Sequence, residues 1–467
     1  MIFDQLEKFG DTTALIEESG KAWSFNQLVA EADNIASLME KRSLAFLLCR
    51  NCVSAVTAYV GALRHGMVPL LLNGEIQDEL LEHLLKAYHP KYLWMEVGRK
   101  ASIGKVLYSD GNYQLWDTGE EKYPINDDLA VLLSTSGSTG SPKLVRQSYK
   151  NIMANTLSIA KYLSLTSDDR AITTMPMYYT YGLSIIQTQL FAGGSIVLTE
   201  ASMFARVFWE LLKKYEVTNF GGVPYTYEML KRMRFGRMDL PSLRFITQAG
   251  GKLAADISAE FAKVCDDKGI KFITMYGACE ATARMAYLPW EYAQDKAGSI
   301  GIAIPEGRLA LMDDRGAEIT ASDIDGELIY YGDNVTLGYT ECQDDLSKGD
   351  ENHGVLHTGD IARRDGDGFY YITGRKKRFL KLFGNRVSLD AVEAYLKSQG
   401  YLSCACAGAD DKLVVYTTED INTKELCLRL GEFTHLHSSA FAVVKVEEIP
   451  RNSSGKILYE SLKGLGM

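Results

Sequence analysis

Short runs of apolar residues recur along the first half of the chain and alternate with amphipathic segments. The runs occupy residues 44–49, 68–72, 129–133, 195–198 and 243–247. Such runs are typical of strands that are buried on both faces of a sheet. Between them, residues 25–36 and 203–215 space their apolar side chains as an amphipathic helix does. The alternation predicts an α/β fold with a largely parallel sheet.

After about residue 305 the pattern changes to short strands and tight turns, as at residues 326–332 and 365–372. These segments predict the hairpins of a small β-subdomain. From residue 388 onwards, helix-like and strand-like segments alternate again over about 80 residues. We therefore predict a large N-terminal domain of layered α/β subdomains with a small β-subdomain, residues 1–376. A small mobile α+β lid, residues 377–467, follows it.

Composition and charge narrow the class of protein. Of the 467 residues, 46% are hydrophobic and 24% charged, which is typical of a globular protein. The formal net charge of -10 disfavours a nucleic-acid partner. The longest apolar runs fall far short of the roughly 20 residues that a membrane span needs, and acidic residues near the N-terminus argue against a signal peptide. We expect a cytoplasmic protein whose eight cysteines are reduced thiols.

A loop rich in glycine and hydroxyl residues follows the apolar run at residues 129–133. Glycines leave backbone N–H groups free to approach phosphate, hydroxyls add hydrogen bonds, and a lysine supplies a cation. A flexible linker is disfavoured, because the loop lies between a buried strand and a helix-like segment and ends in Pro-Lys. The spacing is not that of a P-loop, since Leu144 follows the lysine. The loop predicts a polyphosphate site formed by Ser134, Thr135, Ser136, Gly137, Ser138, Thr139, Gly140 and Lys143.

This loop and four further segments occur in an order that resembles the adenylate-forming superfamily. The further segments are residues 275–280 (MYGACE), 357–360 (HTGD), 374–375 (GR) and 450–456 (PRNSSGK). The superfamily includes acyl-CoA synthetases, peptide-synthetase adenylation domains and beetle luciferases. The resemblance implies that ATP and Mg²⁺ convert a carboxylic acid into an acyl-adenylate with release of pyrophosphate. A thiol of coenzyme A or of the phosphopantetheine of a separate carrier protein then takes the acyl group.

Two other readings remain open. One is a ligase of the same fold that transfers the acyl group to an amine or a hydroxyl, with an amino or hydroxy acid as its substrate. The other is a non-catalytic nucleotide-binding relative, against which the joint presence of Lys143, Glu280, Asp360 and Lys456 argues. The sequence does not identify the acid, the acceptor or the oligomeric state.

The resemblance assigns a role to several residues. It implies that Tyr276 stacks on adenine beside Gly277 and that Glu280 binds Mg²⁺, and both side chains suit these ligands. Cys279 stands where the family usually has threonine, which weakens a hydroxyl contact near the α-phosphate. The loop containing Gly250 and Gly251 resembles the segment that packs against adenine and the acyl chain.

Further roles fall in the last third of the chain. Asp360 and Arg375 match the residues that bind the ribose hydroxyls. Lys456 matches the catalytic lysine, which would stabilise the negative charge of the pentavalent transition state from the closing lid. Lys377 falls at the hinge of the lid, and Lys381 and Gly384 match the segment that lines the entry of the thiol.

The acid pocket is predicted to include residues 175–182. By spacing, Tyr179 takes the place of the residue that gates the carboxylate, and Thr180 the place where relatives that activate α-amino acids carry an aspartate. No acidic residue occurs between 175 and 189, so a buried ammonium group would lack a counter-charge. An α-amino acid is therefore disfavoured. Met275 and Tyr225 are further candidates for the pocket, and Arg284 would favour a polar or anionic acid.

Overall fold

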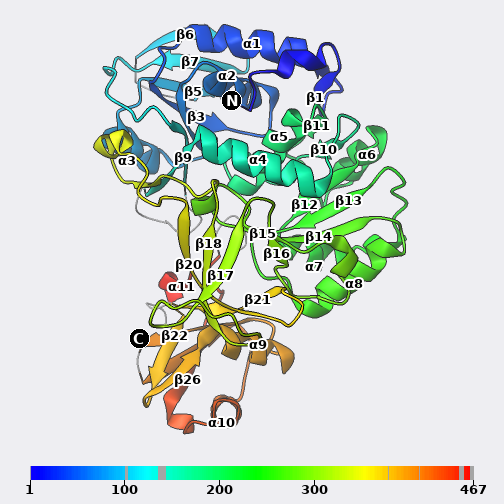
Figure 1. Cartoon of the computed structure of the whole chain (residues 1–467), viewed down its shortest axis with the longest axis vertical. Helices are drawn as coiled ribbons and strands as arrows, with labels where there is room; N and C mark the ends of the chain where they lie inside the picture. The colour runs from blue at the N-terminus through cyan, green and yellow to red at the C-terminus, as the bar shows by residue number, and fades with distance from the viewer. Residues whose placement is uncertain are drawn as a thin grey trace. The chain divides into compact units, whose positions relative to one another are not determined.

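The computed structural model describes residues 2–99, 104–134, 143–376, 378–409, 411–451 and 457–462. The chain divides into two compact units, Met1–Arg308 with Tyr330–Leu356, and Leu309–Ile329 with His357–Met467 (Figure 1). The α/β class expected from the sequence is confirmed. The domain boundary between residues 376 and 377 stays a prediction, and Lys377 lies outside the described residues.

One sheet of the first unit is parallel at its centre, from β14 to β1, and antiparallel at both edges. In spatial order, its strands are β16 (Ile302–Ala303), β15 (Ala286–Tyr287), β14 (Lys271–Tyr276), β13 (Phe245–Gln248), β12 (Asn219–Gly222), β10 (Arg170–Ile172), β11 (Ser195–Leu198), β1 (Thr13–Glu17) and β2 (Ala22–Ser24). The carboxyl ends of parallel strands in such a sheet are the usual place for a ligand.

A second sheet of this unit has parallel strands from β8 to β5 and antiparallel strands on either side. In spatial order, its strands are β19 (Gly338–Thr340), β9 (Leu144–Ser148), β8 (Leu129–Ser134), β4 (Val68–Asn73), β3 (Leu44–Cys49), β5 (Tyr92–Glu96), β7 (Tyr113–Asp117) and β6 (Lys105–Ser109). The apolar runs at residues 44–49 and 68–72 are thus confirmed as buried strands.

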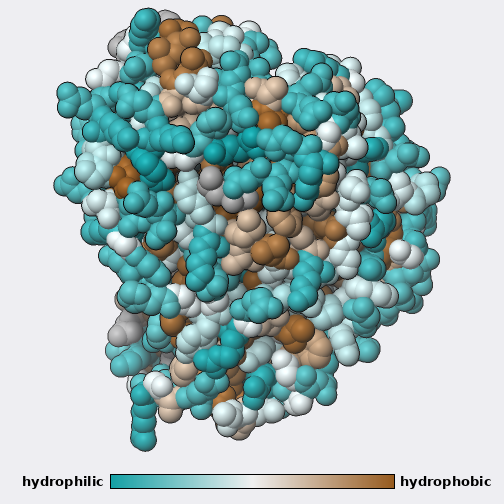
Figure 2. All heavy atoms as spheres, turned by 45° about the horizontal axis from the view of Figure 1, so that its top comes forward, coloured by the Kyte–Doolittle hydropathy of each residue, from teal (hydrophilic) through white to brown (hydrophobic). Residues whose placement is uncertain are grey.

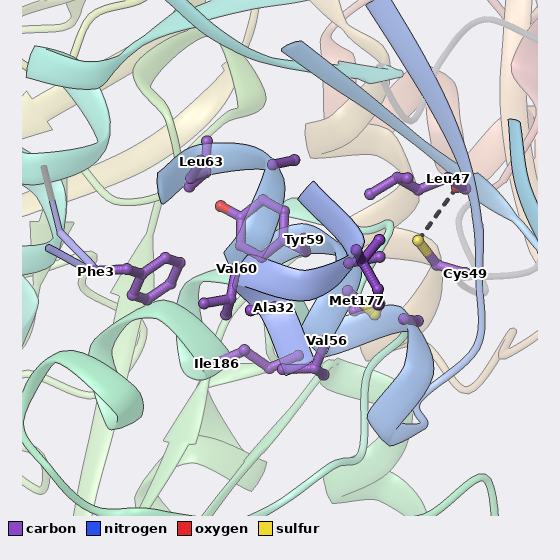
Figure 3. Close-up of a cluster of buried hydrophobic side chains, with 14 of the residues drawn as sticks. Phe3, Ala32, Leu47, Cys49, Val56, Tyr59, Val60, Leu63, Met177 and Ile186 are labelled. Carbon is purple, nitrogen blue, oxygen red and sulfur yellow. Dashed lines mark hydrogen bonds between the residues drawn. The ribbon is translucent and has the colours of Figure 1, made fainter. Parts of the chain in front are cut away.

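A layer of helices packs between these two sheets. Its members are α1 (Phe25–Ser37), α2 (Val53–Arg64), α4 (Tyr149–Leu163) and α5 (Thr180–Phe191). Figure 3 shows part of the core of this layer, where Val56 of α2 lies beside Ile186 of α5, and Tyr59 of α2 and Leu47 of β3 belong to the same cluster. Because α2 contacts protein on all sides, every residue from Val53 to Leu63 is buried. Such helices are apolar all round.

Other helices cover the outer faces of the two sheets. The first sheet is covered by α6 (Arg206–Lys214), α7 (Pro224–Arg232) and α8 (Ala255–Asp266), and the second by α3 (Asp78–Tyr88). Neighbouring residues of a strand face opposite layers, so Leu47 packs against the inner helices and Phe46 against the outer side. This arrangement explains why the strands are apolar without alternation.

The second unit is α+β. One antiparallel sheet contains β17 (Arg308–Met312), β18 (Gly326–Tyr331), β20 (Val355–Arg364) and β21 (Tyr370–Arg375). The remaining strands are β22 (Phe379–Leu382), β23 (Asn385–Ser388), β24 (Cys404–Ala409), β25 (Lys412–Thr417) and β26 (Phe441–Lys445). Helices α9 (Leu389–Ser398) and α10 (Thr423–Thr434) share a core with β22–β26, and α11 (Tyr459–Leu462) contacts β24. The predicted hairpin near residues 365–372 is formed by β20 and β21.

Within the described ranges, no helix has the length and apolar character needed to cross a membrane. On the face shown in Figure 2, hydrophobic groups occur as scattered patches between hydrophilic residues. Isolated apolar groups of this kind are normal on protein surfaces.

Candidate active site

The predicted polyphosphate loop connects two antiparallel strands. Ser134 ends β8 and pairs with Leu144, the first residue of β9. The sequence placed a helix-like segment directly after the loop. Instead, β9 comes first and α4 follows it, because Leu144 and Val145 are buried in the second sheet. The candidates Thr135, Ser136, Gly137, Ser138, Thr139 and Gly140 lie outside the described residues.

The MYGACE segment begins at the carboxyl end of β14, where Tyr276 is half-buried. The chain then folds back so tightly that a Cβ atom on Gly277 would lie 1.8 Å from the carbonyl oxygen of Ala283. Only glycine fits this approach. The short turn Cys279–Ala281 brings Cys279 Sγ to 3.9 Å from the carbonyl oxygen of Ser134. Two predicted nucleotide segments therefore lie side by side.

Glu280 is held at both its backbone and its carboxylate by a segment near β19. Its carbonyl oxygen accepts hydrogen bonds from the backbone N–H and the hydroxyl of Thr336, each at 3.0 Å. Its Oε1 accepts a hydrogen bond from the Tyr339 hydroxyl at 2.7 Å. Burial, and then the Glu280 charge, raise the pKa of Tyr339 above its ordinary value, so the phenol keeps the proton that it donates.

Tyr339 also contacts the predicted cation. Lys143 Nζ lies 3.9 Å from the centroid of the Tyr339 ring, a cation–π distance. The contact follows from the pairing of β19 with β9, in which Tyr339 lies opposite Val145. Buried Arg146 fixes this pairing, because its Nε donates to the carbonyl oxygen of Tyr339 at 3.1 Å and Glu351 neutralises its charge. Tyr339 thus joins Lys143 to Glu280.

Sequence reasoning missed the segment that supports this cluster. Buried Asn334 donates from Nδ2 to the carbonyl oxygens of Ala281, at 2.9 Å, and Arg284, at 2.8 Å. Its Oδ1 accepts a hydrogen bond from Tyr330 at 2.7 Å. Alternation of polar and apolar residues at 334–337 was the available signal, but there the polar side chains are buried as well. They bind backbone groups of the loop that contains Glu280.

The candidate ribose residues lie in the second unit. Asp360 and Arg375 are directly opposite each other on β20 and β21. Arg375 Nε lies 3.0 Å from Asp360 Oδ1, with the carboxylate largely buried and the guanidinium exposed. The structure therefore brings this predicted pair together as an ion pair.

The candidate thiol segment forms the hairpin of β22 and β23, also in the second unit. Lys381 is an exposed residue of β22. Phe383 and Gly384 form the two-residue turn, with φ of 50° and 82°. A Cβ atom on Gly384 would meet no atom within 4 Å, so the glycine is needed for its backbone angle and not for space. Lys456, like Lys377, lies outside the described residues.

The candidates for the acid pocket are placed differently from one another. Met275 and Arg284 line a cavity of the first unit, whereas Tyr225 is exposed at the start of α7 and packs edge-on against Phe204. The Thr180 hydroxyl donates to the carbonyl oxygen of Thr282, so its proton is used within the protein. These placements point to the Arg284 end as the polar part of the pocket.

Tyr179 lies between the pocket and the candidate nucleotide loops. A Cβ atom on Gly250 would be 3.2 Å from the Tyr179 hydroxyl, and one on Gly251 would touch Pro224. Burial raises the pKa of Tyr179 to about 12, with a further increase from Cys279 and an opposing effect of the Arg284 charge. Tyr179 is therefore near the loop of Gly250, near Cys279 and near Arg284. This position suits a residue that gates the carboxylate of the acid.

Glu280 fits a magnesium ligand. Among the residues that the structure describes, no lysine or arginine forms an ion pair with Glu280, and the Tyr339 hydroxyl donates to its Oε1. Among the described residues no group of three or more acidic, His or Cys side chains is placed to bind a metal. A single carboxylate suits Mg²⁺, which takes its other ligands from phosphate oxygens and water.

Comparison with known proteins gives a consistent result. Residues 2–340 match the AMP-binding enzyme family. A 2-succinylbenzoate–CoA ligase of Geobacillus sp. (strain WCH70) is 29% identical over 464 residues, covering 94% of this chain and 89% of the relative. A feruloyl-CoA synthase of Amycolatopsis sp is 28% identical over 347 residues, covering 71% and 69%. The solved o-succinylbenzoate CoA synthetase of Bacillus subtilis, in complex with the acyl-adenylate intermediate, has a TM-score of 0.80 at 23% identity, covering 100% of this chain and 98% of that chain.

Proposed function

We propose which residues of this chain carry out each step of its reaction. The chain belongs to the AMP-binding enzyme family and uses ATP to activate a carboxylic acid for transfer to coenzyme A. The reaction has two half-reactions. In the first, a carboxylate oxygen of the acid attacks the α-phosphorus of ATP, and the bond to pyrophosphate breaks. In the second, the sulfur of the thiol attacks the acyl carbon, and the bond to AMP breaks.

The cluster of Lys143, Tyr339 and Glu280 serves the first half-reaction. Glu280 binds the Mg²⁺ that accompanies ATP, and the ion supplies positive charge to the phosphate oxygens. Lys143 binds the phosphate groups as a second cation. Tyr339 positions both, through its hydroxyl on Glu280 and its ring under Lys143. Lys456 stabilises the charge that develops in the transition state.

Separate residues are proposed for the base and for the ribose of ATP. Tyr276 stacks on adenine, with Gly250 and Gly251 forming the facing loop, and the Asp360 carboxylate accepts hydrogen bonds from the ribose hydroxyls. Support for the ribose assignment comes from the ion pair with Arg375, which orients the Asp360 carboxylate.

The second half-reaction uses the hairpin that contains Lys381 and Gly384. After adenylation, the lid turns at Lys377 and presents this hairpin to the thiol. Coenzyme A is the acceptor, and the phosphopantetheine of a carrier protein is the second acceptor to test. We place the reaction in the cytoplasm.

The acid is a small-molecule carboxylic acid of one of two chemical classes. 2-Succinylbenzoate, named for one relative, carries a second carboxylate. The feruloyl group named for the other carries a phenol ring. Both relatives are less than 30% identical to this chain, so the names of their acids do not identify the acid that this chain uses.

The observation that carries the proposal is that Tyr339 joins Lys143 to Glu280, two residues 137 positions apart that the reaction needs in one place. The test is exchange of labelled pyrophosphate into ATP in the presence of single acids, followed by thioester formation on the same preparation. We expect exchange that depends on both an acid and Mg²⁺. Exchange without thioester formation, from either coenzyme A or carrier proteins, would instead favour transfer to an amine or a hydroxyl.

A further inference from the structure

Arg284 differs from the other buried charged side chains that the structure describes, because it has no partner of opposite charge. Within the described ranges, the charged residues that are buried are Arg146, Asp169, Arg284 and Asp360. Arg146 pairs with Glu351, Asp169 with Arg244, and Asp360 with Arg375. Arg284 is only 3% exposed, and no described aspartate or glutamate forms an ion pair with it. A buried charge normally has a partner of opposite sign.

The contacts that Arg284 does make are with neutral groups. Its Nη2 donates to Ser184 Oγ at 3.2 Å, its Nη1 to the carbonyl oxygen of Ala283 at 3.3 Å, and its Nε lies 3.4 Å from Met275 Sδ. Its Cζ lies 4.2 Å from the centroid of the Tyr181 ring. These contacts orient the guanidinium group, but none of them neutralises its charge.

A cavity lies directly beside this guanidinium group. Its lining includes Arg284, Ser184 and Tyr181. It also includes Gly221, Thr247 and Met275, which are the penultimate residues of β12, β13 and β14. The cavity therefore runs along one face of these strands beneath α5, and its Arg284 end lies near their carboxyl ends, where ligands of α/β sheets bind. In the present arrangement it has space for little more than one water molecule, so it suits a small group.

We propose that the acid substrate carries a second anionic group, a carboxylate or a sulfonate, which enters this cavity and pairs with Arg284. This inference rests on the proposed function and chooses between its two classes of acid. A planar carboxylate accepts two parallel hydrogen bonds from a guanidinium group, and Ser184 lies in reach of the same atoms. The reacting carboxylate then points away from Arg284, past Tyr179, toward the candidate nucleotide loops. A short acid is required, because the cavity is small.

The unpaired charge of Arg284 affects both the selectivity for the acid and the stability of the free enzyme. A site built around an unpaired charge rejects a neutral ligand, because that ligand would leave the charge buried and unpaired in the complex. Arg284 is therefore a specificity-determining residue, and it exists in the free enzyme at the expense of stability.

The test compares matched acids in the pyrophosphate exchange assay. Malonate and succinate are compared with their monoamides, which keep the shape and lose one charge, with propionate and butyrate, and with ferulate. We expect kcat/KM for a diacid to exceed that for its monoamide by about 100-fold or more. In Arg284→Met the preference falls to within a few-fold, whereas Arg284→Lys, which keeps the charge, retains part of it.

Thermal unfolding separates this role from a merely structural one. Arg284→Met removes an unpaired buried charge and is expected to keep or raise the melting temperature. A diacid, added with ATP and Mg²⁺, raises the melting temperature of the wild-type protein but not that of Arg284→Met. Stabilisation by a diacid without exchange would support the anion site and overturn the proposed function.

Other outcomes overturn the inference. Equal exchange with diacids and monoamides, or a preference for ferulate, would refute the second anionic group and leave the acid–thiol ligase standing. A diacid preference that survives in Arg284→Met would assign the anion to another residue. Neither exchange nor stabilisation with any acid of the panel would overturn both proposals.

Discussion

The Tyr339 hydroxyl donates a hydrogen bond of 2.7 Å to Glu280, 59 residues earlier in the chain. Lys143 lies against the ring of the same tyrosine. One side chain therefore touches both the candidate metal ligand and the candidate phosphate-binding cation. Since Tyr339 is partly exposed, its packing alone does not explain this position.

We predict that Tyr339→Phe reduces magnesium-dependent exchange while keeping the fold. The variant keeps the ring beneath Lys143 and loses the hydrogen bond to Glu280. A hydrogen bond to a charged group contributes about 1.5 to 3 kcal/mol, so kcat/KM should fall by about 10-fold or more and the Mg²⁺ concentration for half-maximal rate should rise. Glu280→Gln should show the same change in Mg²⁺ dependence with a larger loss of rate. Unchanged Mg²⁺ dependence in both variants would mean that another residue binds the metal.

The support of the Glu280 loop by Asn334 gives a prediction about stability. Asn334→Ala removes three buried hydrogen bonds and leaves the carbonyl oxygens of Ala281 and Arg284 without this donor. We expect a loss of about 2 to 4 kcal/mol in the free energy of unfolding, measured by denaturant titration, together with reduced exchange activity.

Asn352→Ala is the matched control for this variant. Asn352 is half-buried, and its side chain donates to one backbone carbonyl, that of Thr336. Its substitution should cost about 1 kcal/mol. If both variants unfold at the same denaturant concentration, the hydrogen bonds of Asn334 do not stabilise the Glu280 loop more than a single half-buried hydrogen bond would.

Much of the architecture could be predicted from local sequence. The strand at residues 44–49 and the helix that begins at Phe25 are encoded by an apolar run and by a capping box between Ser24 and Gln27. The glycine of MYGACE and the Asp360 motif were likewise visible as motifs. Each of these features depends on residues that are close together in the chain.

The supports of the site could not be predicted in the same way. Tyr339 and Asn334 act on residues more than 50 positions earlier, through tertiary hydrogen bonds that no local pattern encodes. The sequence showed Arg284 as a cation near the pocket, but not that it is buried without a carboxylate partner. That property depends on how α5 packs over β12–β14, which is a property of the whole unit.

We predict that Lys456→Ala abolishes adenylate formation while ATP still binds, because the lysine acts on the transition state. Loss of one such charge typically costs about 3 kcal/mol or more of barrier, which is about 100-fold in rate. Pyrophosphate exchange gives the rate, and equilibrium binding of ATP gives the affinity. Lys445→Ala is the control, since Lys445 is an exposed residue of the same unit that pairs with Asp420. Exchange at the wild-type rate in Lys456→Ala would remove this lysine from the mechanism.

The last prediction concerns the thiol step and must respect the turn at Gly384. With φ of 82°, this position strains most side chains but tolerates asparagine. Gly384→Asn therefore adds volume with little backbone strain, whereas Gly384→Leu adds volume and strain together. If the β22–β23 hairpin lines the thiol entry, both variants should exchange pyrophosphate at nearly the wild-type rate and form thioester at least about 10-fold more slowly. The asparagine variant isolates obstruction from strain. Loss of thioester formation in Gly384→Leu alone would mean that the turn geometry matters and the space does not. Normal thioester formation in both would place the thiol route elsewhere.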